Sequence, residues 1–251
     1  MTHHGRGRRL IALAAAVLVF ASLCALGVWQ MERRAWKLDL IARVDARVHA
    51  APADPPGPAQ WAQASAAGDE YRRVRVRGTF DNSKEALVQA VSELGPGYWV
   101  LTPLRTDRGF TVLVNRGFVP AELKAPAARA AGQIAGETTV TGLLRMSEPH
   151  GGFLRANRPA QDRWYSRDVA AIAAAKRLAP VAPYFIDADD TPNSGGWPRG
   201  GMTVIHFRNS HLSYAITWFG LAAMMLAWAV WAALDRRRRK PARAGDDGPE
   251  R

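Results

Sequence analysis

Cysteine is nearly absent from this chain. The single cysteine among its 251 residues is Cys24, which lies inside a long apolar run. The segment that follows this run therefore cannot be held together by disulfide bonds. It also has no Cys-x-x-Cys pair, which excludes thiol redox chemistry, and no thiolate for a copper site.

Catalytic signatures are absent as well. The sequence contains no Walker loop, no His-Glu-x-x-His and no Gly-x-Ser-x-Gly. The stretch Asp187-x-Asp189-Asp190 has calcium-loop character, but Thr191-Pro192 replaces the ligand and the glycine that should follow, so we expect a solvated turn. His206 and His211 are five residues apart, which places them on different faces of a helix or a strand and argues against a joint metal site. We expect that the protein is not an enzyme.

Charge is missing from two long stretches. Leu10 to Met31 spans 22 residues without a charged side chain, and Leu212 to Leu234 spans 23. The second would rise about 34 Å as a helix, and a bilayer core is about 30 Å thick, so both are predicted to cross a membrane. A secretory signal is the alternative for the first, but no small-residue cleavage site closes it and it exceeds a typical signal core. We expect it to be retained.

The basic residues predict the orientation. Arginines precede the first run, and Arg236 to Lys240 follow the second, so both ends read as cytoplasmic under the positive-inside rule. The two tails carry 10 of the 34 basic and 4 of the 22 acidic residues, which is half of the net charge of +12. The high pI therefore indicates topology and contact with anionic membrane lipid, not nucleic acid. We expect a cell inner-membrane protein with tails at 1–9 and 235–251, transmembrane helices at 10–31 and 209–234, and an extracytoplasmic (periplasmic) domain at 32–208.

Short strand patterns dominate the domain. Residues 32–49 have a helical period, so we expect the first membrane helix to continue as an amphipathic arm that ends before Pro52. About seven strands are predicted, near residues 73–77, 86–91, 97–103, 111–119, 138–145, 184–186 and 203–207, with a short helix from Asp168 to Leu178 and an exposed connection at 120–136. The predicted fold is a membrane protein whose two transmembrane helices flank an α+β domain rich in antiparallel strands, either a sheet or barrel-like. Arg73, Arg75 and Arg77 would share one strand face, as a solvated surface or as a receiver of anionic groups.

One ionisable side chain, His211, stands at the start of the second apolar run. An imidazole at a membrane interface can ligate a haem iron, and on a helix Tyr214 and Trp218 would share its face. The alternative is that all three side chains are interfacial anchors. The residues alone leave both interpretations open.

Several sequence blocks together resemble the Surfeit locus protein 1 family, in order from about residue 26 to residue 221. They are Gly27-Val28-Trp29-Gln30-x-x-Arg33-x-x-Trp36-Lys37, Val76-Arg77-Gly78-x-Phe80-Asp81, Val114-Asn115-Arg116-Gly117-Phe118-Val119-Pro120, Gly136-Glu137, Trp164 with Arg167-Asp168, Phe185-Ile186-Asp187-Ala188 and Arg208-Asn209-x-His211-Leu212-x-Tyr214-x-x-Thr217-Trp218-x-Gly220-Leu221.

This resemblance implies a membrane-anchored assembly factor for cytochrome c oxidase that binds haem a and assists its insertion into subunit I, close to haem a synthase. His211 corresponds to the family's histidine at the second membrane helix and would ligate the haem iron. We expect Tyr214 and Trp218 to shield the ring and Arg208 to pair with a propionate. The competing expectation is a haem-free membrane scaffold that stabilises subunit I or haem a synthase. Copper delivery is disfavoured, because the outer segment offers no cysteine.

Overall fold

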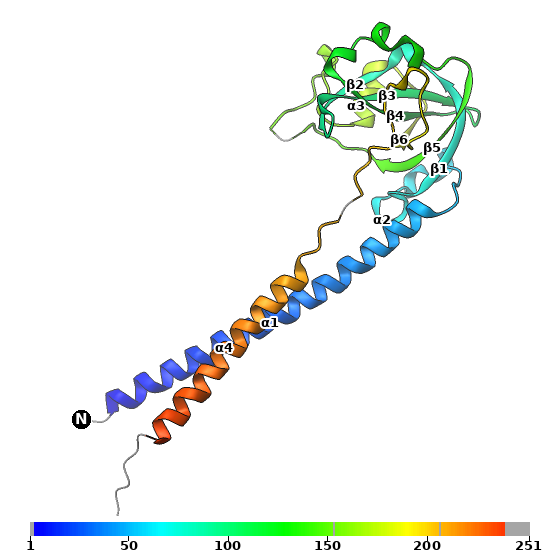
Figure 1. Ribbon diagram of the computed structural model, residues 1–251. Helices are drawn as coiled ribbons and strands as arrows, with labels where there is room; N and C mark the ends of the chain where they lie inside the picture. Colours follow the sequence, from blue (N-terminus) through cyan, green and yellow to red (C-terminus); the bar gives the residue numbers. More distant parts are fainter. Residues whose placement is uncertain (1–2, 153, 206, 239–251) are drawn as a thin grey trace, which may run out of the picture. The chain divides into compact units, whose positions relative to one another are not determined.

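The computed structural model describes residues 3–152, 154–205 and 207–238. The chain divides into two compact units (Figure 1). The helical unit takes in the chain up to Ile41 and again from His206, and the β-rich unit runs from Ala42 to Ile205. Two long apolar helices therefore flank a single β-rich domain, as the sequence predicted.

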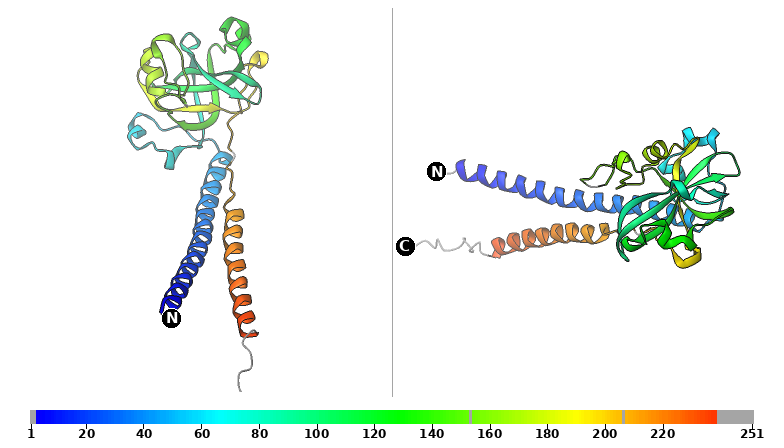
Figure 2. Two further views of the ribbon diagram at one scale, coloured as in Figure 1. Left: turned by 90° about the vertical axis from the view of Figure 1, so that its left-hand side faces the viewer. Right: turned by 90° about the horizontal axis from the view of Figure 1, so that it is seen from above.

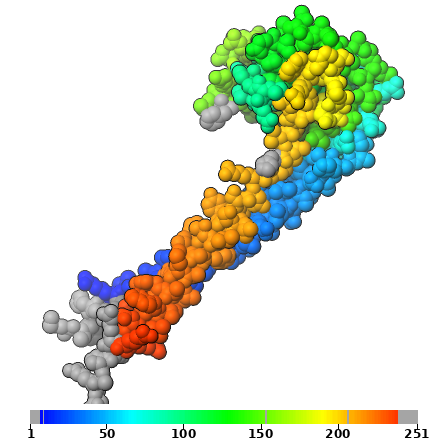
Figure 3. Space-filling model, viewed as in Figure 1, coloured from blue at the N-terminus to red at the C-terminus, as the bar shows by residue number. Residues whose placement is uncertain are grey.

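The helical unit contains α1 (His3–His49) as far as Ile41, together with α4 (His211–Arg238). Both are long and apolar enough to cross a membrane. α1 continues without a break beyond its apolar part, which confirms that residues 32–49 extend the helix, and it ends shortly before Pro52. α4 lies along α1 in the space-filling view (Figure 3).

The two helices pack along a helix seam with a regular spacing. The least exposed positions in the apolar parts recur at alternating steps of four and three residues, which are Ala16, Phe20, Leu23, Gly27 and Gln30 on α1 and His211, Ala215, Trp218, Ala222 and Met225 on α4. Such steps keep one stripe of each helix facing its partner. Small residues allow a close approach, and a Cβ built on Gly27 would lie 2.6 Å from the ring of Phe219.

Six strands form one sheet in the β-rich unit (Figure 2). They are β1 (Arg73–Phe80), β2 (Ala86–Ser92), β3 (Gly95–Thr106), β4 (Thr111–Pro120), β5 (Glu137–Met146) and β6 (Val181–Ala188). The order is β1-β5-β6-β4-β3-β2, and β1 also pairs with β3. Five strands therefore close into a ring, with β2 added to β3. All pairings are antiparallel except β4 with β6.

Two apolar clusters lie on opposite faces of the strands. The first contains Val74, Val76, Phe80, Leu104, Phe110, Val112, Val114, Leu144, Ala182, Tyr184 and Ile186. The second gathers under α3 (Val169–Lys176) and contains Ala86, Val88, Leu101, Leu113, Trp164, Val169, Ile172 and Phe185. The predicted helix start is confirmed, because the side chain of Asp168 accepts a hydrogen bond from Ala171 N at 3.1 Å. β6 contributes to both clusters, so it is buried on both faces and does not alternate.

Short helical turns lie before, between and after the strands. They are η1 (Pro58–Gln63), α2 (Ala66–Asp69), η2 (Asn82–Lys84), η3 (Ala121–Leu123), η4 (Pro126–Gly132), η5 (Pro159–Gln161) and η6 (Ser194–Gly196).

Two predictions fail here. The connection 120–136 is not simply exposed, since Arg129 is buried and forms a two-pronged ion pair with Glu85. The seventh strand near 203–207 does not form: residues 203–205 and 207 have no regular structure, and His206 lies outside the described residues. The physical reason is that strand propensity needs a partner edge, and the described residues of this segment pair with no strand of the sheet.

Candidate functional site

A polar contact in the helix seam joins its two helices. His211 is the first residue of α4, and its Nδ1 lies 2.7 Å from Oε1 of Gln30 on α1. Its backbone N–H donates to the side-chain oxygen of Asn209 at 3.4 Å, at the helix start. Gln30 is only 9% exposed, so this amide is held inside the seam. This contact therefore links α1 to the first residue of α4.

The contact to Gln30 has a consequence for the imidazole. With the amide oxygen accepting, Nδ1 carries the ring proton, and Nε2 presents its lone pair. Nε2 has no hydrogen-bond partner within the described residues. A histidine whose one nitrogen donates to a second group is the arrangement found in metal-ligating histidines, because that bond fixes the tautomer and orients the ring. The donor chemistry of this site therefore fits a haem iron.

The other predicted site residues divide into two groups. Trp218 lies in the helix seam with His211, and its indole Nε1 is buried without a hydrogen-bond partner within the described residues. Tyr214 is 56% exposed, and Arg208 is exposed in the irregular segment before α4. The structure thus brings His211 and Trp218 to one helix face and leaves Tyr214 and Arg208 outside the seam. Sequence reasoning missed Gln30, whose signal was one amide near the end of an apolar run.

Metal ligation by protein side chains alone has little basis. Within residues 3–152, 154–205 and 207–238, no group of three or more His, Cys, Asp or Glu side chains could hold a metal ion. The expected solvated turn at Asp187-x-Asp189-Asp190 needs a correction, because Asp187 is only 2% exposed. It belongs to the end of β6 and not to a turn.

Asp187 is the centre of a polar cluster inside the β-rich unit. It accepts hydrogen bonds from Arg145 Nη1 at 3.0 Å, Arg167 Nη1 at 3.2 Å, Asn115 Nδ2 at 2.8 Å and Thr203 Oγ1 at 3.0 Å. These groups come from β5, β4 and two loops, so one carboxylate connects four segments. A buried charge must be paired and hydrogen-bonded in this way, or its desolvation would outweigh the attraction.

Each arginine of this cluster also has a glutamate partner. Arg167 Nη2 lies 2.5 Å from Glu148 Oε1, and Arg145 Nε lies 3.3 Å from Glu70 Oε1. Burial alone would raise the pKa of Glu148, but the hydrogen bonds and charge of Arg167 outweigh it, and the pKa is lowered. Burial would likewise lower the pKa of Arg167, and the two carboxylates raise it instead. Glu148 and Arg167 therefore hold each other in the ionised form.

Arg116, which follows Asn115 in the sequence, is also a buried cation. Arg116 is 2% exposed, and burial lowers the pKa of its guanidinium to about 10. Its Nη2 donates to the carbonyl of Gly132 and to Asn193 Oδ1, while Nη1 has no partner within the described residues. The contact to Asn193 connects this strand to the loop at 190–204.

The arginine stripe of β1 matches the predicted face. The valines at 74 and 76 point into the core, whereas Arg75 and Arg77 are exposed. Arg77 pairs with Glu137 of β5 at 2.7 Å. An exposed ion pair of this kind contributes little to stability, in accord with a solvated sheet face.

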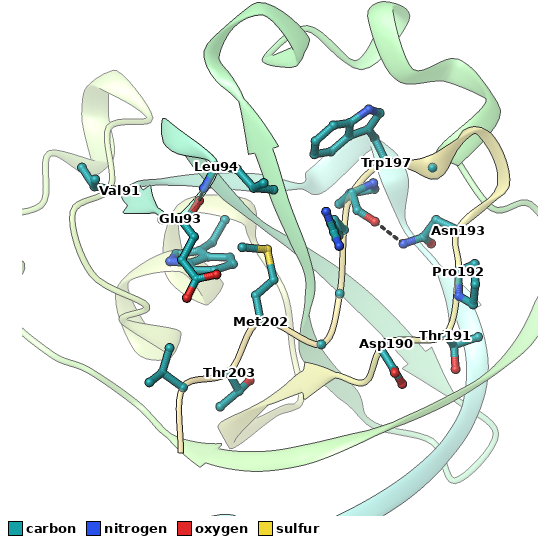
Figure 4. A pocket seen from close by; sticks show the side chains of 18 residues that line it. Val91, Glu93, Leu94, Asp190, Thr191, Pro192, Asn193, Trp197, Met202 and Thr203 are labelled. Carbon is teal, nitrogen blue, oxygen red and sulfur yellow. Dashed lines mark hydrogen bonds between the residues drawn. The ribbon is translucent and has the colours of Figure 1, made fainter. Parts of the chain in front are cut away.

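A pocket of ≈ 890 Å³ lies beside the β2–β3 hairpin in the β-rich unit (Figure 4). Val91, Glu93 and Leu94 lie on its hairpin side, and Asp190 to Asn193 line its other side. Met202 and Thr203 lie between the two sides.

Comparison with known proteins places the chain in a family. A model of the SURF1 family matches residues 17–223. Surfeit locus protein 1 of Homo sapiens is 39% identical over 224 residues, covering 82% of this chain and 72% of the human protein. The Rattus norvegicus protein of the same name is 41% identical over 219 residues (81% and 69%), and a SURF1-like protein of Monosiga brevicollis is 39% identical over 248 residues (93% and 89%). Because the match begins within α1, covers the whole β-rich unit and ends within α4, the chain belongs to the SURF1 family.

Proposed function

We propose that this protein is an assembly factor for cytochrome c oxidase that binds haem a at the start of α4 and assists its insertion into subunit I. Membership of the SURF1 family supports the assembly role. The observation that carries the haem proposal is the contact between His211 Nδ1 and Gln30 Oε1 at 2.7 Å, which leaves Nε2 as the nitrogen available to a metal.

Each side chain of the site has a role in this proposal. His211 binds the haem iron, and Gln30 holds the ring in the tautomer that allows it. Trp218 and Tyr214 shield the cargo from water, and Arg208 pairs with a propionate. Haem a is cargo here, so binding must be reversible, and a single histidine ligand suits release better than two fixed ligands.

The topology and partners follow from the same proposal. Both tails face the cytoplasm and contact anionic lipid, and the β-rich unit is extracytoplasmic. Haem a comes from haem a synthase, and the protein passes it on to oxidase subunit I. The two helices that are long and apolar enough to cross a membrane support this arrangement.

The test is the absorbance of the full-length protein purified from cells that make haem a. We expect a Soret band in the wild type, loss of the band in His211→Ala, and a weaker band in Gln30→Leu, because leucine cannot accept a hydrogen bond from Nδ1–H of His211. His49→Ala is the matched control: His49 is also on α1, is exposed, and lies outside the helix seam.

A Soret band that survives His211→Ala would refute the assignment of His211. A colourless wild-type protein that still co-purifies with subunit I or haem a synthase would instead support the haem-free scaffold. The two functions therefore give opposite results in one experiment.

A further inference from the structure

The exposed apolar side chains of the β-rich unit gather at one place. Among residues 42–152 and 154–205, four large apolar side chains are exposed: Val91 (83%), Leu94 (41%), Leu154 (88%) and Val204 (76%). All except Leu154 line the same pocket of ≈ 890 Å³. Apolar groups that cluster at a hollow, and are not scattered singly, mark a binding site.

A stretch of backbone between the two sides of this pocket has no strand partner among the described residues. Met202 to Ile205 line or adjoin the pocket, and Thr203, Val204 and Ile205 are β-branched residues that favour a strand. Residues 202–205 nevertheless form no backbone hydrogen bond within the part of the chain that the structure describes. The hydrogen bond from Thr203 Oγ1 to Asp187 at 3.0 Å holds the stretch in place. A backbone stretch that is held in place, consists of strand-favouring residues and lacks a pairing partner is a template for the addition of another strand.

The charges at the pocket are mostly acidic. Glu93 on the hairpin and Asp190 on the facing loop are both exposed, and neither has an ion-pair partner within the described residues (Figure 4). Arg199 is the one cation among the residues that line the pocket. An acidic rim on a chain with a net charge of +12 is complementary to a basic ligand.

We propose that this pocket binds an extended, apolar segment of a partner polypeptide that carries basic side chains. Its backbone pairs with Met202–Ile205, as in the addition of a strand to a sheet. Its apolar side chains cover Val91, Leu94 and Val204, and its basic side chains lie beside Glu93 and Asp190. This docking is independent of haem binding, because the pocket lies wholly within the β-rich unit.

The test uses a labelled peptide of alternating valine and lysine, titrated into the full-length protein in detergent micelles and followed by fluorescence anisotropy. Two further peptides serve as controls, one with glutamate in place of lysine and one with N-methylated backbone amides, which cannot pair as a strand. We expect the lysine peptide to bind, and both controls to bind at least about tenfold more weakly.

Three variants locate the binding on the protein. Val204→Asn is expected to weaken binding of the lysine peptide by about tenfold. Glu93→Lys should reverse the preference between the lysine and glutamate peptides. Leu154→Asn is the matched control, because Leu154 is the one exposed large apolar side chain among residues 42–152 and 154–205 that lies outside the pocket. Peptide binding by this variant should equal that of the wild type. Unchanged thermal unfolding of each variant shows that it is folded.

Four results would overturn the proposal. They are no binding up to millimolar peptide, equal binding of the N-methylated peptide, equal binding of the lysine and glutamate peptides, and binding that Val204→Asn leaves unchanged. A fifth is a dimer that Val204→Asn converts to monomer, since the occupant would then be a second copy of this chain.

Discussion

Neutralising Asp187 should destabilise the β-rich unit more than any exposed acidic substitution. Asp187→Asn keeps the shape of the side chain and removes the charge that faces Arg145 and Arg167. Asp187 is 2% exposed, and hydrogen bonds from four side chains connect β6 to β5, to β4 and to the loops at Arg167 and Thr203. The substitution also places an N–H₂ group against donors, so at least one buried contact becomes a donor–donor clash.

The magnitude follows from what the two arginines retain. Breaking a buried ion pair by removing one partner costs about 3–5 kcal/mol. Here each guanidinium keeps a second partner, Glu70 for Arg145 and Glu148 for Arg167, so we expect the lower end, about 3 kcal/mol. For a unit of this size that corresponds to a fall in Tm of about 6–12 °C.

The measurement is thermal unfolding of the full-length protein in detergent, followed by the β-sheet amide I band in the infrared, which reports the β-rich unit and not the helices. Asp190→Asn is the matched control: the carboxylate is exposed and only three residues away, and its Tm should change by no more than about 2 °C. A Tm for Asp187→Asn that equals that of Asp190→Asn would show that the cluster does not stabilise the fold.

Two further predictions concern the helix seam and acid stability. Gly27→Val should lower the free energy of unfolding by about 1–3 kcal/mol through overpacking, because a Cβ there would lie 2.6 Å from the ring of Phe219. Unfolding in SDS measures the loss. Adding Phe219→Ala should restore the stability, and a double variant as unstable as Gly27→Val would refute the overpacking. The folded pKa of Glu148 lies below its ordinary value of 4.5, so its contribution to stability is complete above pH 4.5 and is lost as pH falls through the lower folded pKa. Glu148→Gln should therefore flatten the decline in Tm below pH 4.5, and an unchanged acid profile would contradict the pairing with Arg167.

Local patterns were sufficient for the two long apolar helices and for most of the strands. A charge-free run of 20 or more residues has few stable solutions other than a membrane helix, and the apolar parts of α1 and α4 are such runs. Strict alternation in 73–77 likewise determines which side chains of β1 face the core. These properties depend only on neighbours along the chain.

The interpretation of residues 203–207 shows where such reasoning ends. The β-branched pattern there is real, but a strand exists only when a second backbone pairs with it, and none is present in the sheet. The prediction for Asp187 was wrong for a different reason. Its neighbours in sequence suggested a solvated turn, and its partners Arg145, Arg167 and Asn115 are far away along the chain.

The sequence by itself determined the two apolar helices, the β-rich domain between them and the histidine at the entry to the second helix. Only the tertiary structure decided which nitrogen of His211 is engaged, because Gln30 lies 181 residues away. Tertiary structure alone also decided that the ring of strands closes through β1 and β3, and that the unpaired backbone at 202–205 lies beside an apolar, acidic pocket. The physical reason is the same in each case: hydrogen bonds and ion pairs join groups by distance in space, and one-dimensional patterns record only distance along the chain.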